Sequence, residues 1–183
     1  MIETCEICGF DATGMSMAQV HIETAAVSRQ LVDFVQSCTD ADLLAPPSSQ
    51  RWSATEYLFH LSQALATTRD LIERGLAADR PVIEPPDPDV GIHEFEQSSR
   101  QPADVVGRFE RRVDRLLPQI ERLDGDGSVR TIVMGHSRIR GDIGEVSLAR
   151  VARNGLHELF HHDIDVREVV GIARSVRINE STA

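Results

Sequence analysis

The chain has 183 residues, of which 41% are hydrophobic, 26% charged and only 4% aromatic. These proportions fit one globular domain with a mainly aliphatic core, and such a core favours helices over a sheet sandwich. The formal net charge is −10, and an acidic surface repels phosphate backbones, so we expect no nucleic-acid partner. No apolar stretch approaches the ~18 residues of a membrane span, so we expect no membrane partner.

Three cysteines are present, Cys5, Cys8 and Cys38. Their odd number, with no apolar signal segment before them, argues against a disulfide framework and favours a reducing, cytoplasmic location. Cys38 fits a small buried hydrophobe. A homodimer is compatible with the sequence, and the expected partner is a small-molecule substrate.

The first half of the chain predicts an arm and two helices. Residues 1–15 contain C-E-I-C-G-F-D and no periodic pattern, so we interpret them as an N-terminal arm. Apolar periodicity predicts a helix over 17–38, followed by a loop that ends in two prolines. Ser53 and Glu56 have the spacing of a capping box, which predicts that a second helix begins there and runs to about residue 74.

The second half begins with a proline-rich, extended connection over 81–91. The pattern then predicts a third helix over 103–123, two short strands over 129–134 and 138–143, and a last helix over 146–170. The predicted fold class is therefore all-α, a four-helix bundle with a short two-stranded element before the last helix. We assign residues 16–172 to the bundle and residues 173–183 to a C-terminal tail.

The last helix carries the run H-E-L-F-H-H-D-I-D. His157 and His161 are four residues apart, so both imidazoles can face one ion, and Asp165 extends the same line. His60 in the second helix is the best candidate for a third ligand, with Glu56 one turn before it. Three protein ligands leave a coordination position open, as in catalytic metal sites.

Other interpretations of these histidines stay open. A single histidine is more often a surface or hydrogen-bonded core residue than a ligand, and H-x-x-x-H on a helix is a weak motif. On an ideal helical wheel, His157 and His161 lie roughly opposite the main apolar stripe of the last helix. His162 lies nearer that stripe and is the alternative inward-facing ligand.

The segments W-S-A-T-E-Y-L-F-H around His60 and H-E-L-F-H around His157 and His161 resemble the DinB/YfiT-like superfamily over about residues 17–171. This superfamily includes the mycothiol-dependent maleylpyruvate isomerase and related thiol S-transferases. The resemblance implies a four-helix bundle with a three-histidine site for zinc, nickel or iron and, in some members, activation of a low-molecular-weight thiol. The isomerase subgroup has a glutamate at one ligand position, whereas this assignment gives histidine at all three.

The segment C-E-I-C-G-F-D also resembles the start of some actinobacterial members. Cys5 and Cys8 have the spacing of a zinc half-site, which needs two further ligands. His162, His136 and His21 are candidates for them. A redox pair, unbound thiols and an arm folding over the active site are the alternatives.

The sequence therefore predicts a divalent-metal-dependent enzyme of small-molecule metabolism, which we expect to be a thiol S-transferase of the mycothiol type. Zinc is the expected metal, with nickel or iron as alternatives, and mycothiol is the expected co-substrate. Glu56, Glu158 and Asp165 are the candidate proton carriers. The alternatives are a non-catalytic, stress-associated metal-binding protein and a hydrolase that uses metal-bound water.

Overall fold

The computed structural model describes residues 3–84, 94, 98–137 and 141–181 of the chain. Most of the proline-rich connection predicted over 81–91 lies outside these residues, as do the first three residues of the strand predicted over 138–143.

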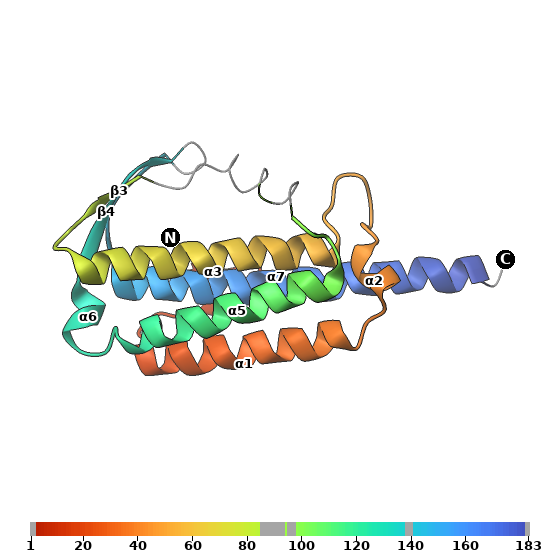
Figure 1. Cartoon of the computed structure of the whole chain (residues 1–183), viewed down its shortest axis with the longest axis horizontal. Helices are drawn as coiled ribbons and strands as arrows, with labels where there is room; N and C mark the ends of the chain where they lie inside the picture. Colours follow the sequence, from red (N-terminus) through yellow and green to blue (C-terminus); the bar gives the residue numbers. More distant parts are fainter. Residues whose placement is uncertain (1–2, 85–93, 95–97, 138–140, 182–183) are drawn as a thin grey trace.

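Four long helices form the body of the molecule (Figure 1). They are α1 (Met17–Gln36), α3 (Ala54–Ala77), α5 (Pro102–Glu121) and α7 (Leu148–Ser181). Both α1 and α3 pack against α5 and α7, so α1 and α3 occupy diagonal corners of the bundle. The predicted all-α four-helix bundle is confirmed.

Helix starts follow local side-chain chemistry. A capping box opens α1, in which the Ser16 side chain accepts from the Gln19 backbone and the Gln19 side chain accepts from Ser16. The predicted box at α3 is present too, because the Ser53 backbone N–H and hydroxyl both donate to Glu56 Oε2 at 2.8 Å. Helix α3 continues past the predicted end and includes Gly75, where a Cβ would meet Leu148 Cδ2 at 2.4 Å.

Two features at the right-hand end of Figure 1 differ from the sequence prediction. A short helix, α2 (Asp40–Leu44), lies within the predicted loop. In addition, α7 continues well beyond the predicted end at residue 170, so residues 173–181 of the predicted tail are helical. The two features are linked, because the buried Asp42 carboxylate accepts hydrogen bonds from Arg174 and Arg177 of α7.

A small sheet covers the opposite end of the bundle (Figure 1). The predicted hairpin is present as β4 (Thr131–Ser137) antiparallel to β5 (Gly141–Ser147), a few residues later than expected. A third strand, β3 (Val82–Ile83), pairs parallel with β4 and was not predicted. A four-residue helix, α6 (Asp126–Val129), leads into β4.

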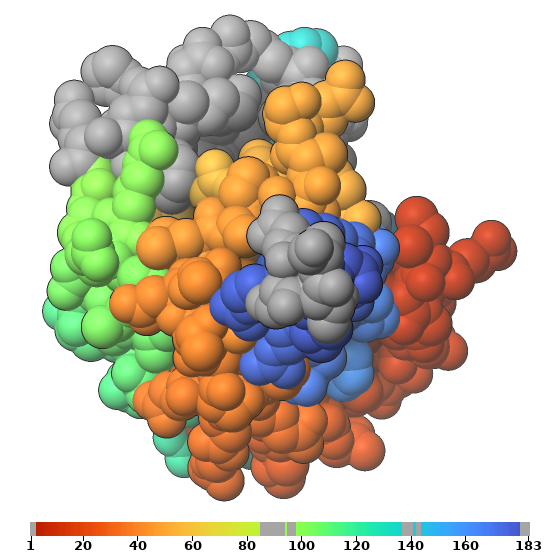
Figure 2. Space-filling view, turned by 90° about the vertical axis from the view of Figure 1, so that its right-hand side faces the viewer, coloured from red at the N-terminus to blue at the C-terminus, as the bar shows by residue number. Residues whose placement is uncertain are grey.

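The N-terminal arm is folded onto the bundle as a hairpin of β1 (Thr4–Cys5) and β2 (Phe10–Asp11). Phe10 is buried in the core. Arg153 of α7 holds both ends of the arm, because it pairs with Glu3 at 2.8 Å and donates to the Met15 carbonyl at 2.6 Å. Figure 2 shows the N-terminal residues in red on the flank of the molecule beside the blue α7.

The main apolar stripe predicted for the last helix is confirmed as core. Its members are all buried: Leu148, Val151, Ala152, Leu156, Leu159 and Val166. His157 is also buried, at 5% exposure, so α7 has buried positions on a second side, where the arm covers it. None of the described helices is long and apolar enough to cross a bilayer.

The packing of α7 on α3 leads to a stability prediction. A Cβ at Gly155 would lie 2.8 Å from Thr68 Cγ2 and 2.9 Å from Thr68 Oγ1, whereas a Cβ at Gly171 of the same helix would meet nothing within 4 Å. We expect Gly155→Ala to lower the free energy of unfolding by about 1–3 kcal/mol through overpacking. Gly171→Ala should raise it by about 0.5–1 kcal/mol through helix propensity. Urea unfolding measures both, and equal effects would contradict the close approach of α3 and α7.

Candidate metal centre

Helices α3 and α7 bring two histidines and one carboxylate together in the bundle. His60, Glu158 and His162 each offer one ligand atom, and these atoms lie within 4.8 Å of one another. Glu158 Oε2 lies 3.8 Å from His60 Nε2 and 3.6 Å from His162 Nε2. Since Glu158 and His162 are four residues apart, they share one face of α7. We call this group the carboxylate cluster.

The charge states of the residues in the carboxylate cluster depend on one another. Burial opposes the ionisation of Glu158, but hydrogen bonds from His162 and His60 outweigh it and hold its pKa well below the usual value. Burial also opposes the charging of His162, but hydrogen bonds to Glu158 and Asp165 raise its pKa. Two imidazoles and one carboxylate are a donor set with which proteins hold catalytic zinc, with a fourth position open.

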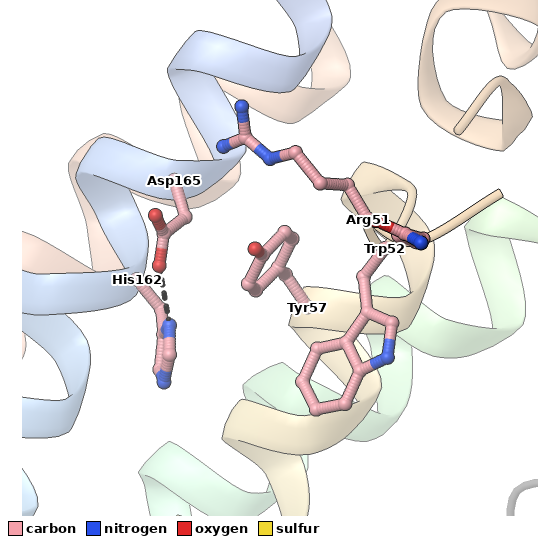
Figure 3. Close-up of a pocket in the computed structure, with 6 residues that line it drawn as sticks. Arg51, Trp52, Tyr57, His162 and Asp165 are labelled. Atoms are coloured by element: carbon pink, nitrogen blue, oxygen red, sulfur yellow. Dashed lines mark hydrogen bonds and ion pairs between the residues drawn. The ribbon is translucent and has the colours of Figure 1, made fainter. Parts of the chain in front are cut away.

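Asp165 orients one ring of the carboxylate cluster. His162 Nδ1 donates to Asp165 Oδ2 at 2.8 Å, which is the dashed contact in Figure 3. This hydrogen bond fixes the ring so that Nε2 faces Glu158. A carboxylate on the far nitrogen of a histidine ligand is the usual support of a metal site.

A pocket of about 290 Å³ opens beside the carboxylate cluster. Its lining is polar and aromatic: Gln50, Arg51, Trp52, Tyr57, His162 and Asp165. Figure 3 shows Tyr57 between Trp52 and the α7 residues. The Trp52 ring also lies 5.3 Å from the His60 ring, so the same aromatic side chain borders the pocket and the cluster.

Two pocket residues have well-defined charge states. Burial and the nearby Asp165 carboxylate raise the pKa of Tyr57, so its hydroxyl remains protonated and can donate. Arg51 makes a bidentate pair with Glu168 of α7 at 2.9 and 3.0 Å, which raises the pKa of the guanidinium. The pocket therefore has one fixed cation and one neutral hydroxyl donor at its rim.

A second group of potential ligands lies on another face of α7. Its members are Cys5, Cys8, His157 and His161, whose ligand atoms lie within 4.8 Å of one another. We call this group the thiol cluster. Cys5 Sγ lies 3.8 Å from His161 Nδ1. A backbone hydrogen bond from Cys8 lowers the pKa of Cys5 to about 7, whereas burial raises the pKa of Cys8.

The structure thus distributes the predicted ligands over two clusters. His60 lies in the carboxylate cluster, whereas His157 and His161 lie in the thiol cluster, so the three histidines do not form one ligand set. The alternative ligand named from the helical wheel, His162, joins His60. Glu158, and not a third histidine, is the other potential donor beside His60 and His162.

The remaining predicted residues have other surroundings. Glu56 is held in the capping box of α3, with Oε2 accepting from Ser53, so it is not a member of either cluster. His21 and His136, considered as partners of the cysteines, are not members either. His161, His162 and Asp165 form a third, overlapping group, but Asp165 is already bonded to His162 Nδ1.

Comparison with known proteins supports the fold. The YfiT protein from Bacillus subtilis, described as a probable metal-dependent hydrolase with an unusual four-helix bundle topology, superposes with a TM-score of 0.66 at 14% identity over 87% of each chain. The mycothiol-dependent maleylpyruvate isomerase superposes with a TM-score of 0.61 at 13% identity. That match covers 84% of this chain but only 62% of the isomerase.

A third four-helix bundle protein, TT2238, superposes with a TM-score of 0.50 at 15% identity, over 79% of this chain and 95% of the other. No curated protein sequence matches the chain significantly. The sequence profile of the DinB superfamily matches residues 23–165, which include all of α3 and α5, parts of α1 and α7, and the whole carboxylate cluster. The chain therefore belongs to the DinB superfamily.

Proposed function

We propose that this protein is a divalent-metal-dependent enzyme that transfers a low-molecular-weight thiol of the mycothiol type to a small electrophile. The observation that carries the proposal is the carboxylate cluster, which combines three donors, an open fourth position and an adjacent polar pocket. A divalent ion held there would supply a Lewis acid that lowers the pKa of a thiol or water. The superposed isomerase is, by its name, mycothiol-dependent.

The chain's own residues have distinct roles in this proposal. His60, Glu158 and His162 would hold the ion. Asp165 is a positioning residue, since it fixes the His162 ring. Tyr57 donates a hydrogen bond to substrate in the pocket.

Arg51 lines the pocket, and its bidentate pair with Glu168 holds the guanidinium in place and compensates its charge. Trp52 lies against both Tyr57 and His60, so it excludes water from one side of the cluster. Zinc is the metal that we propose, because two imidazoles and a carboxylate suit it.

A hydrolase is the second candidate function. The same cluster and pocket would activate water instead of a thiol. The specific support is the superposition on YfiT, which is described as a probable metal-dependent hydrolase and whose chain matches this one in length more evenly than the isomerase does.

Loss of the Asp165 carboxylate should weaken metal binding at the carboxylate cluster. We expect Asp165→Asn to lower zinc affinity there by about 10–100-fold, because an amide orients the His162 ring less strongly. Asp163→Asn is the matched control on the same helix, since Asp163 pairs with Arg167 and belongs to neither cluster. Competition with a chromophoric chelator measures both affinities, and equal values would show that Asp165 has no such role.

Thiol transfer can be tested directly with mycothiol and monochlorobimane. In this reaction the thiol sulfur forms a C–S bond with the bimane, and chloride leaves together with the thiol proton. We expect the zinc-loaded protein to accelerate this reaction. Glu158→Gln should lower the rate by at least about 100-fold, because the group that holds the activating ion is lost. Fluorescence of the conjugate measures the rate.

Arg80→Gln is the control variant, since Arg80 pairs with Glu145 beside the sheet and away from the pocket. A different result is cleavage of p-nitrophenyl acetate by the wild type without any thiol, together with loss of that activity in Glu158→Gln. This result would favour the hydrolase over the transferase. A thiol-transfer rate that is equal in the Glu158 and Arg80 variants would contradict a role of the carboxylate cluster in the reaction.

A further inference from the structure

The thiol cluster joins the N-terminal hairpin to α7. Cys5 lies at the end of β1, and Cys8 lies in the turn between β1 and β2. Gly9 follows with a φ of +72°, a left-handed conformation that glycine adopts without strain. This tight turn places both thiols on the same side of the hairpin, facing α7.

The other half of the thiol cluster comes from α7. His157 and His161 are four residues apart, so their rings lie one above the other on the helix, with centroids 5.4 Å apart. His157 is only 5% exposed, and the Phe10 ring of the hairpin lies 5.4 Å from it. The two imidazoles are thus covered by the same hairpin that carries the thiols.

Two sulfur and two nitrogen donors form a complete tetrahedral zinc set. Zinc binds cysteine sulfur at about 2.3 Å and histidine nitrogen at about 2.0–2.1 Å. Ligand atoms that already lie within 4.8 Å of one another therefore need only a small contraction to reach one ion. Four protein ligands leave no position for substrate, which distinguishes this group from the three-donor carboxylate cluster.

The hairpin is held in place by contacts other than the cluster. Arg153 pairs with Glu3 and donates to the Met15 carbonyl, on either side of the cysteine turn. Phe10 packs on Phe160 with ring centroids 5.4 Å apart. The four donors are therefore preorganised by the fold. Binding of an ion would then cost little further conformational entropy.

A redox pair is less consistent with these surroundings. Cys5 and Cys8 are both free thiols, and a disulfide between them would use neither histidine. His161 beside Cys5 suits a redox pair as well, but such a pair gives no reason for the buried His157 to face the sulfurs too. Cation coordination accounts for all four side chains.

We propose that Cys5, Cys8, His157 and His161 form a second, closed zinc site, which fixes the N-terminal hairpin on α7. The site shares no ligand with the carboxylate cluster and does not depend on the proposed thiol transfer. Its role is structural, because a zinc ion bound there would cross-link residues far apart in the sequence and contribute directly to folding free energy.

Metal content and cobalt spectroscopy test the proposal on the full-length protein. We expect two zinc ions per wild-type chain and the loss of one in Cys5→Ser/Cys8→Ser. Cobalt-loaded wild type should show a sulfur-to-cobalt charge-transfer band that the double cysteine variant lacks. Cys38→Ser is the matched control, since the Cys38 sulfur accepts from Arg174 and lies outside the cluster.

His60→Ala separates the two sites. This variant should lose the ion of the carboxylate cluster and keep the charge-transfer band of the thiol cluster. The cobalt spectrum of the wild type tests the proposal by itself. The test therefore still works if the double cysteine variant does not fold. A wild-type spectrum without a thiolate band, or a band that persists in Cys5→Ser/Cys8→Ser, would overturn the closed site. A failure of the thiol-transfer assay alone would affect only the proposed function.

Discussion

Both clusters depend on the rotation of one helix about its own axis. On α7, the pair His157 and His161 and the pair Glu158 and His162 each have the four-residue spacing that aligns side chains along a helix. The pairs are offset by one residue, so they point about 100° apart. One pair faces the N-terminal hairpin and the other faces α3. A small rotation of α7 would misalign both sets of donors at once.

Several contacts along α7 fix this rotation. Near its start, Gly75 of α3 makes room for the Leu148 side chain, and about two turns further along Gly155 makes room for Thr68 of α3. At the far end, the buried Asp42 carboxylate binds Arg174. These contacts lie on both sides of the clusters, so the segment between them is restrained from two directions. The rigid backbone then sets the donor geometry.

The fold was predictable where local chemistry decides it. The 3.6-residue periodicity located all four long helices, and Ser53 with Glu56 located the start of α3. The short α2 was missed although Thr39 and Asp42 form a capping box at its start, because five residues are too few to show a helical period. The pairing of Asp42 with Arg174, 132 positions later, has no local signal. The two-residue β3 was missed because it pairs with a distant strand and has no periodicity of its own.

The ligand sets were less predictable for the same reason. H-x-x-x-H and E-x-x-x-H occur one residue apart on α7, and spacing alone cannot say which pair faces His60. The helical wheel contained the needed signal, since it placed His162 nearer the apolar stripe than His157 and His161. The choice of three imidazoles grouped His60 with the histidine pair that faces the N-terminal hairpin. The meeting of Cys5 with His161 depends entirely on the docking of the arm, which no local pattern specifies.

The different donors of the two clusters also allow them to coexist at short range. The His161 and His162 rings belong to different clusters, yet their centroids are only 5.2 Å apart. A zinc ion bound by two thiolates and two neutral imidazoles has no net charge, so it would repel a second cation only weakly. The carboxylate cluster has a single carboxylate among its donors and would keep a net positive charge with a divalent ion. That charge is what activates a thiol or water, so the sulfur-rich site suits a structural role and the carboxylate cluster a chemical one.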